Sequence, residues 1–129
     1  MSTNCNIGIL TENNIVEYIY CHFDGYVIIK RDNLIIKGAG YLLYKHYQNI
    51  NKIKLLLKFG DIKNLECCPS LCDNFASVDY DDVMYHTLSL DEFETRNYPL
   101  YKYLFKDGEW FVKYHKDDWV KVKDYKYER

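Results

Sequence analysis

The chain has little glycine or proline and no long apolar run. Its 129 residues include only six glycines and two prolines, a composition that argues against a disordered or low-complexity chain. The apolar runs are far shorter than the roughly 20 residues that a membrane-spanning helix needs. The first ten residues lack the basic flank and apolar core of a secretion signal. We therefore expect a cytoplasmic protein that makes no membrane contact and folds as a single domain over residues 1–129.

A large excess of charge of one sign is also absent. The formal net charge is −2, which disfavours a nucleic-acid binder that relies on a basic overall field. The charges are nonetheless unevenly spread along the chain. Residues 27–64 hold eight basic and two acidic side chains, whereas residues 65–97 hold eight acidic side chains and one basic side chain. Such blocks steer a protein toward a charged partner, unless they interleave in the folded molecule and cancel.

Aromatic residues, by contrast, are abundant. They make up 17% of the chain, and 14 residues are tyrosines. Many tyrosines in a small domain serve either as core residues whose hydroxyl reaches water or as a contact surface for a partner. At the level of composition both interpretations stand.

The order of the predicted elements indicates an α+β fold. Residues 6–10 and 15–23 predict a hairpin whose turn contains Asn13 and Asn14, residue types that tolerate positive φ. After residue 99, three aromatic or β-branched runs predict a C-terminal meander over residues 100–123. We expect an antiparallel sheet, built from the N-terminal hairpin plus the C-terminal meander, with two or three helices on one side.

Helical periodicity lies between these two groups of strands. Residues 41–47 predict one helix, and an apolar stripe over residues 50–57 predicts the next. Asn49 or Asn51 is its expected N-cap, and Gly60 stands where a glycine commonly follows a helix end. Further along the chain, the capping-box spacing of Ser89 and Glu92 predicts a third, short helix. Residues 61–88, between the second and third helices, are expected to be irregular and acidic.

Two short β-type runs, residues 27–30 and 34–37, flank the polar triplet Arg31-Asp32-Asn33. They predict a hairpin arm that projects from the body and contacts a partner, unless the segment packs as additional sheet. The partner-binding candidates are the basic side chains of this block and a neighbouring tyrosine: Lys30, Arg31, Lys37, Lys45, Lys52 and Tyr26.

The five cysteines lie at positions 5, 21, 67, 68 and 72. An odd number without a secretion signal indicates reduced thiols. Cys67, Cys68 and Cys72 would supply half of a zinc site, with His22, His46, His86 or His115 as further ligands. No second ligand pair follows at zinc-finger spacing. We therefore expect these cysteines to be free of metal and the protein to hold no cofactor.

One compact group of residues has the composition of a catalytic site. His22 and Asp24 share a side if the strand continues, and a histidine–carboxylate pair is common in proton transfer. Cys21 would point to the opposite face. The alternative, which we favour, is that Tyr20, His22 and Asp24 are structural. A buried histidine then finds a hydrogen-bond partner, Asp24 accepts from the amides of the turn, and Gly25 supplies the φ that the turn needs.

The same stretch carries a resemblance. Residues 17–26 contain Tyr-x-Tyr-x-His-x-Asp-Gly-Tyr, which resembles the opening signature of a family of small, largely uncharacterised proteins of phages, plasmids and other mobile elements. Two helices matching residues 40–47 and 54–62 follow in that family, and an Asp-Gly-Glu-Trp turn like that at residues 107–110 comes near its end. The family lacks the insertion at residues 27–37, and the acidic stretch 65–88 matches nothing in it.

The resemblance implies a mobile-element setting in a bacterial host rather than a reaction. Small phage proteins often block a host protein, so the leading hypothesis is a non-enzymatic anti-defence inhibitor, such as an anti-CRISPR, that binds stoichiometrically. Its partner would be a host defence protein or ribonucleoprotein complex. A first alternative is an RNA- or nucleotide-binding module that uses residues 27–64 for phosphates and tyrosines for stacking. A second is a small hydrolase or nuclease that uses His22 and Asp24. The oligomeric state is left open.

Overall fold

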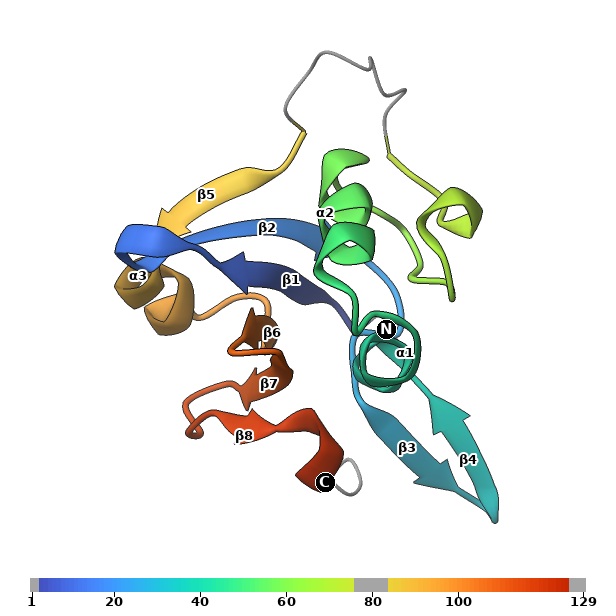
Figure 1. Ribbon diagram of the computed structural model, residues 1–129. Helices are drawn as coiled ribbons and strands as arrows, with labels where there is room; N and C mark the ends of the chain where they lie inside the picture. Colours follow the sequence, from blue (N-terminus) through green and yellow to red (C-terminus); the bar gives the residue numbers. More distant parts are fainter. Residues whose placement is uncertain (1–2, 76–83, 126–129) are drawn as a thin grey trace.

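The computed structural model describes residues 3–75 and 84–125 (Figure 1). Its centre is a six-stranded sheet of order β5-β2-β1-β6-β7-β8. The strands are β1 (Cys5–Leu10), β2 (Ile15–Cys21), β5 (His86–Ser89), β6 (Tyr101–Lys106), β7 (Glu109–Tyr114) and β8 (Val120–Lys121). The predicted α+β class is confirmed, and both the N-terminal hairpin and the C-terminal meander are present.

The two main hairpins form where the turn residues predict them. Asn13 and Asn14, between β1 and β2, adopt φ values of 64° and 57°, and Asp107 and Gly108, between β6 and β7, adopt 53° and 76°. Asn, Asp and Gly enter this left-handed region at lower cost than other residues. Both turns therefore fix the register of the strands that they join.

The hairpin and the meander meet through a parallel pairing that the sequence does not predict. β1 pairs antiparallel with β2 on one side and parallel with β6 on the other, with Cys5 opposite Tyr101 and Ile9 opposite Phe105. The sheet is thus mixed, although its other pairings are antiparallel. Buried side chains occupy most of β1, as expected for a strand with neighbours on both sides.

The helices cover both faces of this sheet, which corrects the expectation of helices on one side. α1 (Ala39–His46) and α2 (Ile50–Lys58) pack in the larger core together with Ile7 and Ile19. α3 (Leu90–Thr95) instead places Phe93 against Val16, so it lies on the opposite side of β1 and β2 (Figure 1). The apolar side chains of β2 alternate between the two cores, which explains why both faces of this strand are apolar.

The local signals of the helices are confirmed. Asn49 is the N-cap of α2, and its side chain accepts hydrogen bonds from the backbone of Asn51 and Lys52. Gly60 follows the helix with φ of 78°. Ser89 caps α3 through the backbone N–H of Glu92. Within the described residues no helix has the length and apolar character needed to cross a membrane.

The stretch 61–88 is less irregular than expected. Its last residues begin β5, which extends the sheet by pairing with β2 from Ile15–Ser89 to Tyr18–His86. The side chain of Asp61 joins the same region, because its Oδ1 atom accepts from the backbone N–H of Tyr20 and lies 2.9 Å from Nε2 of His86. Part of the predicted irregular stretch, residues 76–83, lies outside the described residues.

The segment 27–37 forms a separate two-stranded sheet of β3 (Ile28–Arg31) and β4 (Leu34–Lys37). In Figure 1 this hairpin extends away from the body of the molecule. The predicted arm is therefore present, and the alternative of additional strands in the main sheet is wrong.

Candidate partner-binding surface

Each face of the arm combines apolar and cationic side chains. The register places Ile29, Ile36, Arg31 and Leu34 on one face, which we call the Arg31 face, because paired residues of a hairpin point to the same side. The other face carries Ile28, Lys30, Ile35 and Lys37. Leu34 is 66% exposed and Ile35 is 55% exposed. The outer part of the arm therefore presents aliphatic side chains to solvent beside its cations.

The base of the arm, unlike its tip, is tied to the body. The backbone N–H of Gly38 donates to the carbonyl of Val27 at 2.9 Å, and Ile28 and Ile29 pack against the larger core. The Nζ atom of Lys37 lies 4.8 Å from the centre of the Tyr41 ring. An isolated two-stranded hairpin is marginally stable in water, so these contacts hold the arm in place.

A cavity of about 440 Å³ lies where the Arg31 face of the arm meets the body. Its apolar lining comes from Phe23, Ile29 and Ile36, and Asp24 and Arg31 add opposite charges. Thr3 and Tyr26 complete the lining. We call this space the arm cavity. A partner side chain with an apolar stem and a polar end fits this combination of groups.

A row of aromatic rings begins at the arm cavity and continues along the end of the sheet. His22 stands 4.5 Å from Phe23 and 6.0 Å from Phe75 between ring centres, and Tyr20 stands 5.9 Å from His22. The hydroxyl of Tyr98 lies 3.3 Å from that of Tyr20. We call these five residues the aromatic ridge. Tyr98, Phe75 and Phe23 are 60%, 50% and 41% exposed, so the ridge offers a contiguous aromatic surface.

The inner part of the ridge is fixed by hydrogen bonds around one hydroxyl. The Tyr20 oxygen accepts from Nδ2 of Asn4 at 2.8 Å and lies 2.9 Å from Nδ1 of His22. Burial and the neighbouring Tyr98 hydroxyl raise the pKa of Tyr20. Tyr20 is therefore neutral at physiological pH and acts as an anchor for the ring of His22.

The proposed histidine–carboxylate pair does not form in the way that strand alternation predicts. β2 ends at Cys21, and the backbone N–H of His22 donates to Ile62. His22 is half-buried and binds Tyr20, whereas the side chain of Asp24 is exposed. The Asp24 carboxylate accepts from the Tyr26 hydroxyl at 3.0 Å. Burial, followed by this contact, raises the pKa of Tyr26 to about 12.

The turn at residues 24–25 differs from the expectation in two respects. The positive φ belongs to Asp24, at 55°, and not to Gly25. Glycine is needed at position 25 for space, because a Cβ atom there would lie 2.6 Å from the carbonyl carbon of Asn4 and 2.9 Å from the backbone nitrogen of Cys5. In place of the turn amides, the Tyr26 hydroxyl is the donor to the Asp24 carboxylate.

Three of the other predicted contact residues lie away from the arm tip. Lys45 is exposed on α1. The Nζ atom of Lys52 donates to the carbonyls of His46 and Cys67 at 2.6 and 2.7 Å, so its ammonium group joins α1 to the loop that contains Cys67. Tyr26 is 7% exposed and belongs to the core. We therefore base the candidate surface on the arm, the arm cavity and the ridge and not on Lys52, and Tyr26 contributes to it only through the cavity lining.

The cysteine-containing loop is held by its own hydrogen bonds. Cys72 is buried, accepts from the backbone N–H of Glu66 and donates to the carbonyl of Cys68. Burial is the main cause that raises the pKa of the Cys72 thiol. In the part of the chain that the structure describes, no three His, Cys, Asp or Glu side chains are grouped so that they could hold a metal.

Sequence reasoning missed two of the five ridge residues. Phe75 lies in the stretch expected to be irregular, and Tyr98 lies in the segment before β6. Both reach the ridge through long-range packing against Tyr20. The signature Tyr-x-Tyr-x-His-x-Asp-Gly-Tyr was the only signal near this place, and it contains the inner residues Tyr20 and His22.

Comparisons of the chain with protein-family models, with curated proteins and with solved structures find no match. The resemblance to mobile-element proteins therefore stays a prediction.

Proposed function

We propose that this protein acts by stoichiometric binding to a partner protein, whose activity it inhibits, and that the Arg31 face, the arm cavity and the aromatic ridge form the contact surface. The observation that supports this most is the position of Phe23. It belongs to the ridge and also lines the cavity beneath Arg31. The three parts therefore join into one surface that runs from Tyr98 to the arm tip.

The chemistry of this surface favours a protein over RNA. Protein interfaces are enriched in aromatic residues and arginine at their centres, as here. The outer arm also exposes Leu34, Ile35 and Ile36, and aliphatic side chains of this kind offer nothing to a phosphate backbone. Of the nearby charges, Arg31 stands beside Asp24 at the cavity, and Lys63 lies 3.9 Å from Asp73. Such mixed charges do not form the basic track that RNA binding requires.

The exposed arm also suggests why a partner is needed. Leu34 is 66% exposed. Covering its side chain with a partner would stabilise the complex by roughly 25 cal/mol per Å² of apolar surface buried. In the mobile-element setting that the resemblance implies, the partner would be a bacterial defence protein or ribonucleoprotein complex. An anti-CRISPR protein is one such inhibitor. This assignment of the partner comes from the class of protein and not from the residues of the surface.

The test is inhibition of a panel of purified bacterial defence effectors, CRISPR effector complexes included, at equimolar protein. We expect at least one effector to be inhibited and to co-elute with the protein in size-exclusion chromatography. An arm-less variant in which Asn-Gly replaces residues 28–37 should keep its fold, because Gly38 already bonds to Val27 across the base. It should lose at least ten-fold in affinity. Leu34→Ala should weaken binding, and the matched control Leu55→Ala, on α2 and 47% exposed, should not.

Three outcomes would overturn the proposal. The first is that no effector of the panel is inhibited. The second is a folded arm-less variant that inhibits as well as the parent. The third is a different activity: a salt-sensitive shift with RNA would favour the nucleic-acid module, and substrate turnover lost in folded His22→Ala would favour the hydrolase.

A further inference from the structure

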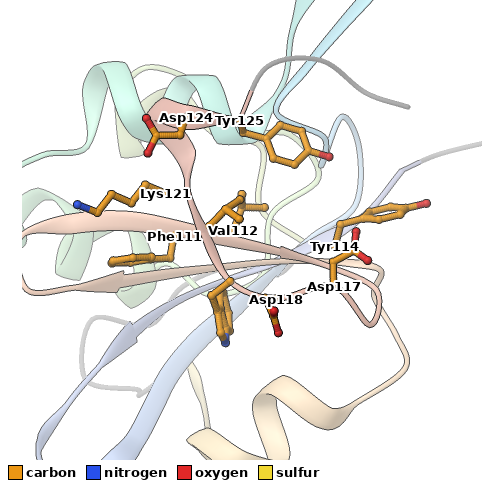
Figure 2. A pocket seen from close by; sticks show the side chains of 10 residues that line it. Phe111, Val112, Tyr114, Asp117, Asp118, Lys121, Asp124 and Tyr125 are labelled. Atoms are coloured by element: carbon orange, nitrogen blue, oxygen red, sulfur yellow. The ribbon is translucent and has the colours of Figure 1, made fainter.

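A second, larger cavity lies at the β8 edge of the six-stranded sheet. β8 pairs with β7 only at Phe111–Lys121 and Val112–Val120. A trough of about 660 Å³ borders this short pairing, with buried Val112 at its floor (Figure 2). This volume is in the range of small-molecule and side-chain binding sites. None of the trough residues belongs to the surface proposed above.

The sides of the trough are aromatic and are held by neighbouring groups. They come from Phe111, Tyr114, Trp119 and Tyr125, all half-buried. The ring of Trp119 stacks on Phe93, with 6.4 Å between ring centres and an angle of 4° between planes, and its Nε1 atom donates to Glu94 at 2.9 Å. Tyr114 packs against Tyr101 at 4.8 Å. Tyr114 packs with the larger core and Trp119 with the smaller core, so these contacts fix one ring on each face of the sheet edge.

The charged residues that line the trough are mostly acidic. Asp117, Asp118 and Asp124 stand on its exposed rim. Among the described residues, the carboxylates of Asp118 and Asp124 take part in no ion pair. Lys121 also lines the trough, but its Nζ atom lies 3.1 Å from Oε2 of Glu109, and in Figure 2 its ammonium group points away from Val112. Glu109 pairs with both Lys121 and Lys123, and Asp118 and Asp124 are the acidic groups on which the trough's negative charge rests.

We propose that this trough binds the side chain of an arginine or lysine from a basic segment of a partner protein. Aromatic faces attract cations through their quadrupole, and carboxylates form charge-assisted hydrogen bonds with guanidinium and ammonium groups. The half-buried rings suit an alkyl stem, and the exposed aspartates suit its charged end. The same negative rim repels anionic ligands. The occupation of the trough does not depend on the function proposed for the arm.

The test uses the isotopically labelled full chain and the peptide acetyl-Gly-Arg-Gly-Arg-Gly-amide. We expect saturable chemical-shift changes at the indole N–H of Trp119 and the amides of residues 117–125. The same peptide with citrulline in place of arginine has nearly the same shape but no charge, and it should bind at least ten-fold more weakly. The double variant Asp118→Asn/Asp124→Asn should also lose at least ten-fold, whereas the control Asp107→Asn, at the β6–β7 turn, should leave the affinity unchanged.

Equal affinity for the citrulline peptide would overturn the proposal, as would shift changes that map outside the trough. Unchanged affinity in the double variant, with its fold checked by circular dichroism, would do the same. Spermidine is the last ligand to be titrated. Tighter binding of spermidine than of the peptide would identify a free polyamine, and not a protein side chain, as the occupant.

Discussion

The hydroxyl oxygen of Tyr20 lies 2.9 Å from Nδ1 of His22, and the same oxygen accepts a hydrogen bond from the side chain of Asn4 at 2.8 Å. One oxygen therefore connects the residue that precedes β1, the end of β2 and the residue that follows β2. It fixes the ring of His22 in the aromatic ridge without giving that ring a carboxylate partner.

Tyr20→Phe is expected to lower the free energy of unfolding by about 1–2 kcal/mol, because it leaves two part-buried polar groups without their partner. Because the aromatic ring is kept, the decrease in the free energy of unfolding measures the contribution of the hydroxyl alone. Urea unfolding followed by circular dichroism measures it. Tyr98→Phe is the control, since it removes only a 3.3 Å contact of an exposed residue, and its effect should stay within about 0.5 kcal/mol. Equal effects of the two variants would contradict this role of Tyr20.

Gly25→Ala is expected to destabilise the protein by about 3 kcal/mol, at the upper end of overpacking effects. Its Cβ would meet backbone atoms of Asn4 and Cys5, which cannot move aside as a side-chain tip can. Gly108→Ala provides the comparison, because a Cβ there meets nothing within 4 Å and only the φ of 76° is unfavourable. That variant should lose about 1 kcal/mol. Chemical denaturation of both variants under one condition gives the difference.

Asp24→Ala is expected to cost about 1–2 kcal/mol, from the lost hydrogen bond of Tyr26 and from an alanine at φ of 55°. Asp24→Asn keeps an acceptor and tolerates that φ, so it should stay within about 0.5 kcal/mol of the parent. Asp24 is one of seven residues that line the arm cavity, so we expect at most a small loss of partner binding beyond the loss of folded protein. An Asp24→Asn protein that melts like the parent but has lost all activity would instead identify this turn as a working site.

The stability of the protein should fall as the pH rises from 10 to 12. The pKa of Tyr26 is raised from 10.0 to about 12. In this interval the unfolded chain has lost the phenolic proton while the folded chain still holds it. Unfolding then releases a proton, and this one group lowers the free energy of unfolding by up to about 1.4 kcal/mol per pH unit. Tyr26→Phe should make the pH dependence of urea unfolding less steep, and an unchanged slope would contradict the assignment.

The thiols should react with a thiol reagent in the order of their exposure. Cys67 is exposed, Cys68 is half-buried, and Cys5, Cys21 and Cys72 are buried. Burial also raises the pKa of Cys5 and Cys72, which lowers their thiolate fraction. We expect rapid labelling of Cys67 and labelling of the buried three only in denaturant. Metal analysis should find no stoichiometric zinc, and zinc that disappears with Cys72→Ser would show this expectation to be wrong.

The parts of the fold that the sequence predicts are those with local causes. The turns at Asn13 and Asp107, the Asn49 cap and the arm each depend on a few adjacent residues, and all are present. The position of α3 has no such local cause. Its one buried residue, Phe93, is too weak a pattern to say which face of the sheet the helix covers.

The candidate surface likewise has one part that the sequence predicts and one part that it does not. The arm and its cations follow from the run of residues 27–37, and the structure bears out the hairpin. The ridge depends on Phe75 and Tyr98, which are distant from Tyr20 in the sequence and contact it only through the tertiary fold. By sequence, Lys52 is expected to be a free contact residue on its helix. In the structure its ammonium group instead donates to two backbone carbonyl oxygens. The acceptors belong to His46 and Cys67, which lie outside α2, so the sequence pattern of α2 could not predict this contact.

The parallel pairing of β1 with β6 also orders events in time. β1 lies between β2 and β6, and β6 is synthesised about 90 residues later, so the second edge of β1 stays uncovered until β6 is present. Closing so long a loop is entropically costly, and folds dominated by distant contacts form slowly. A chain cut short before Tyr101 would keep the β1 edge open to other chains. Assembly of this core therefore follows the synthesis of the whole stretch between β1 and β6.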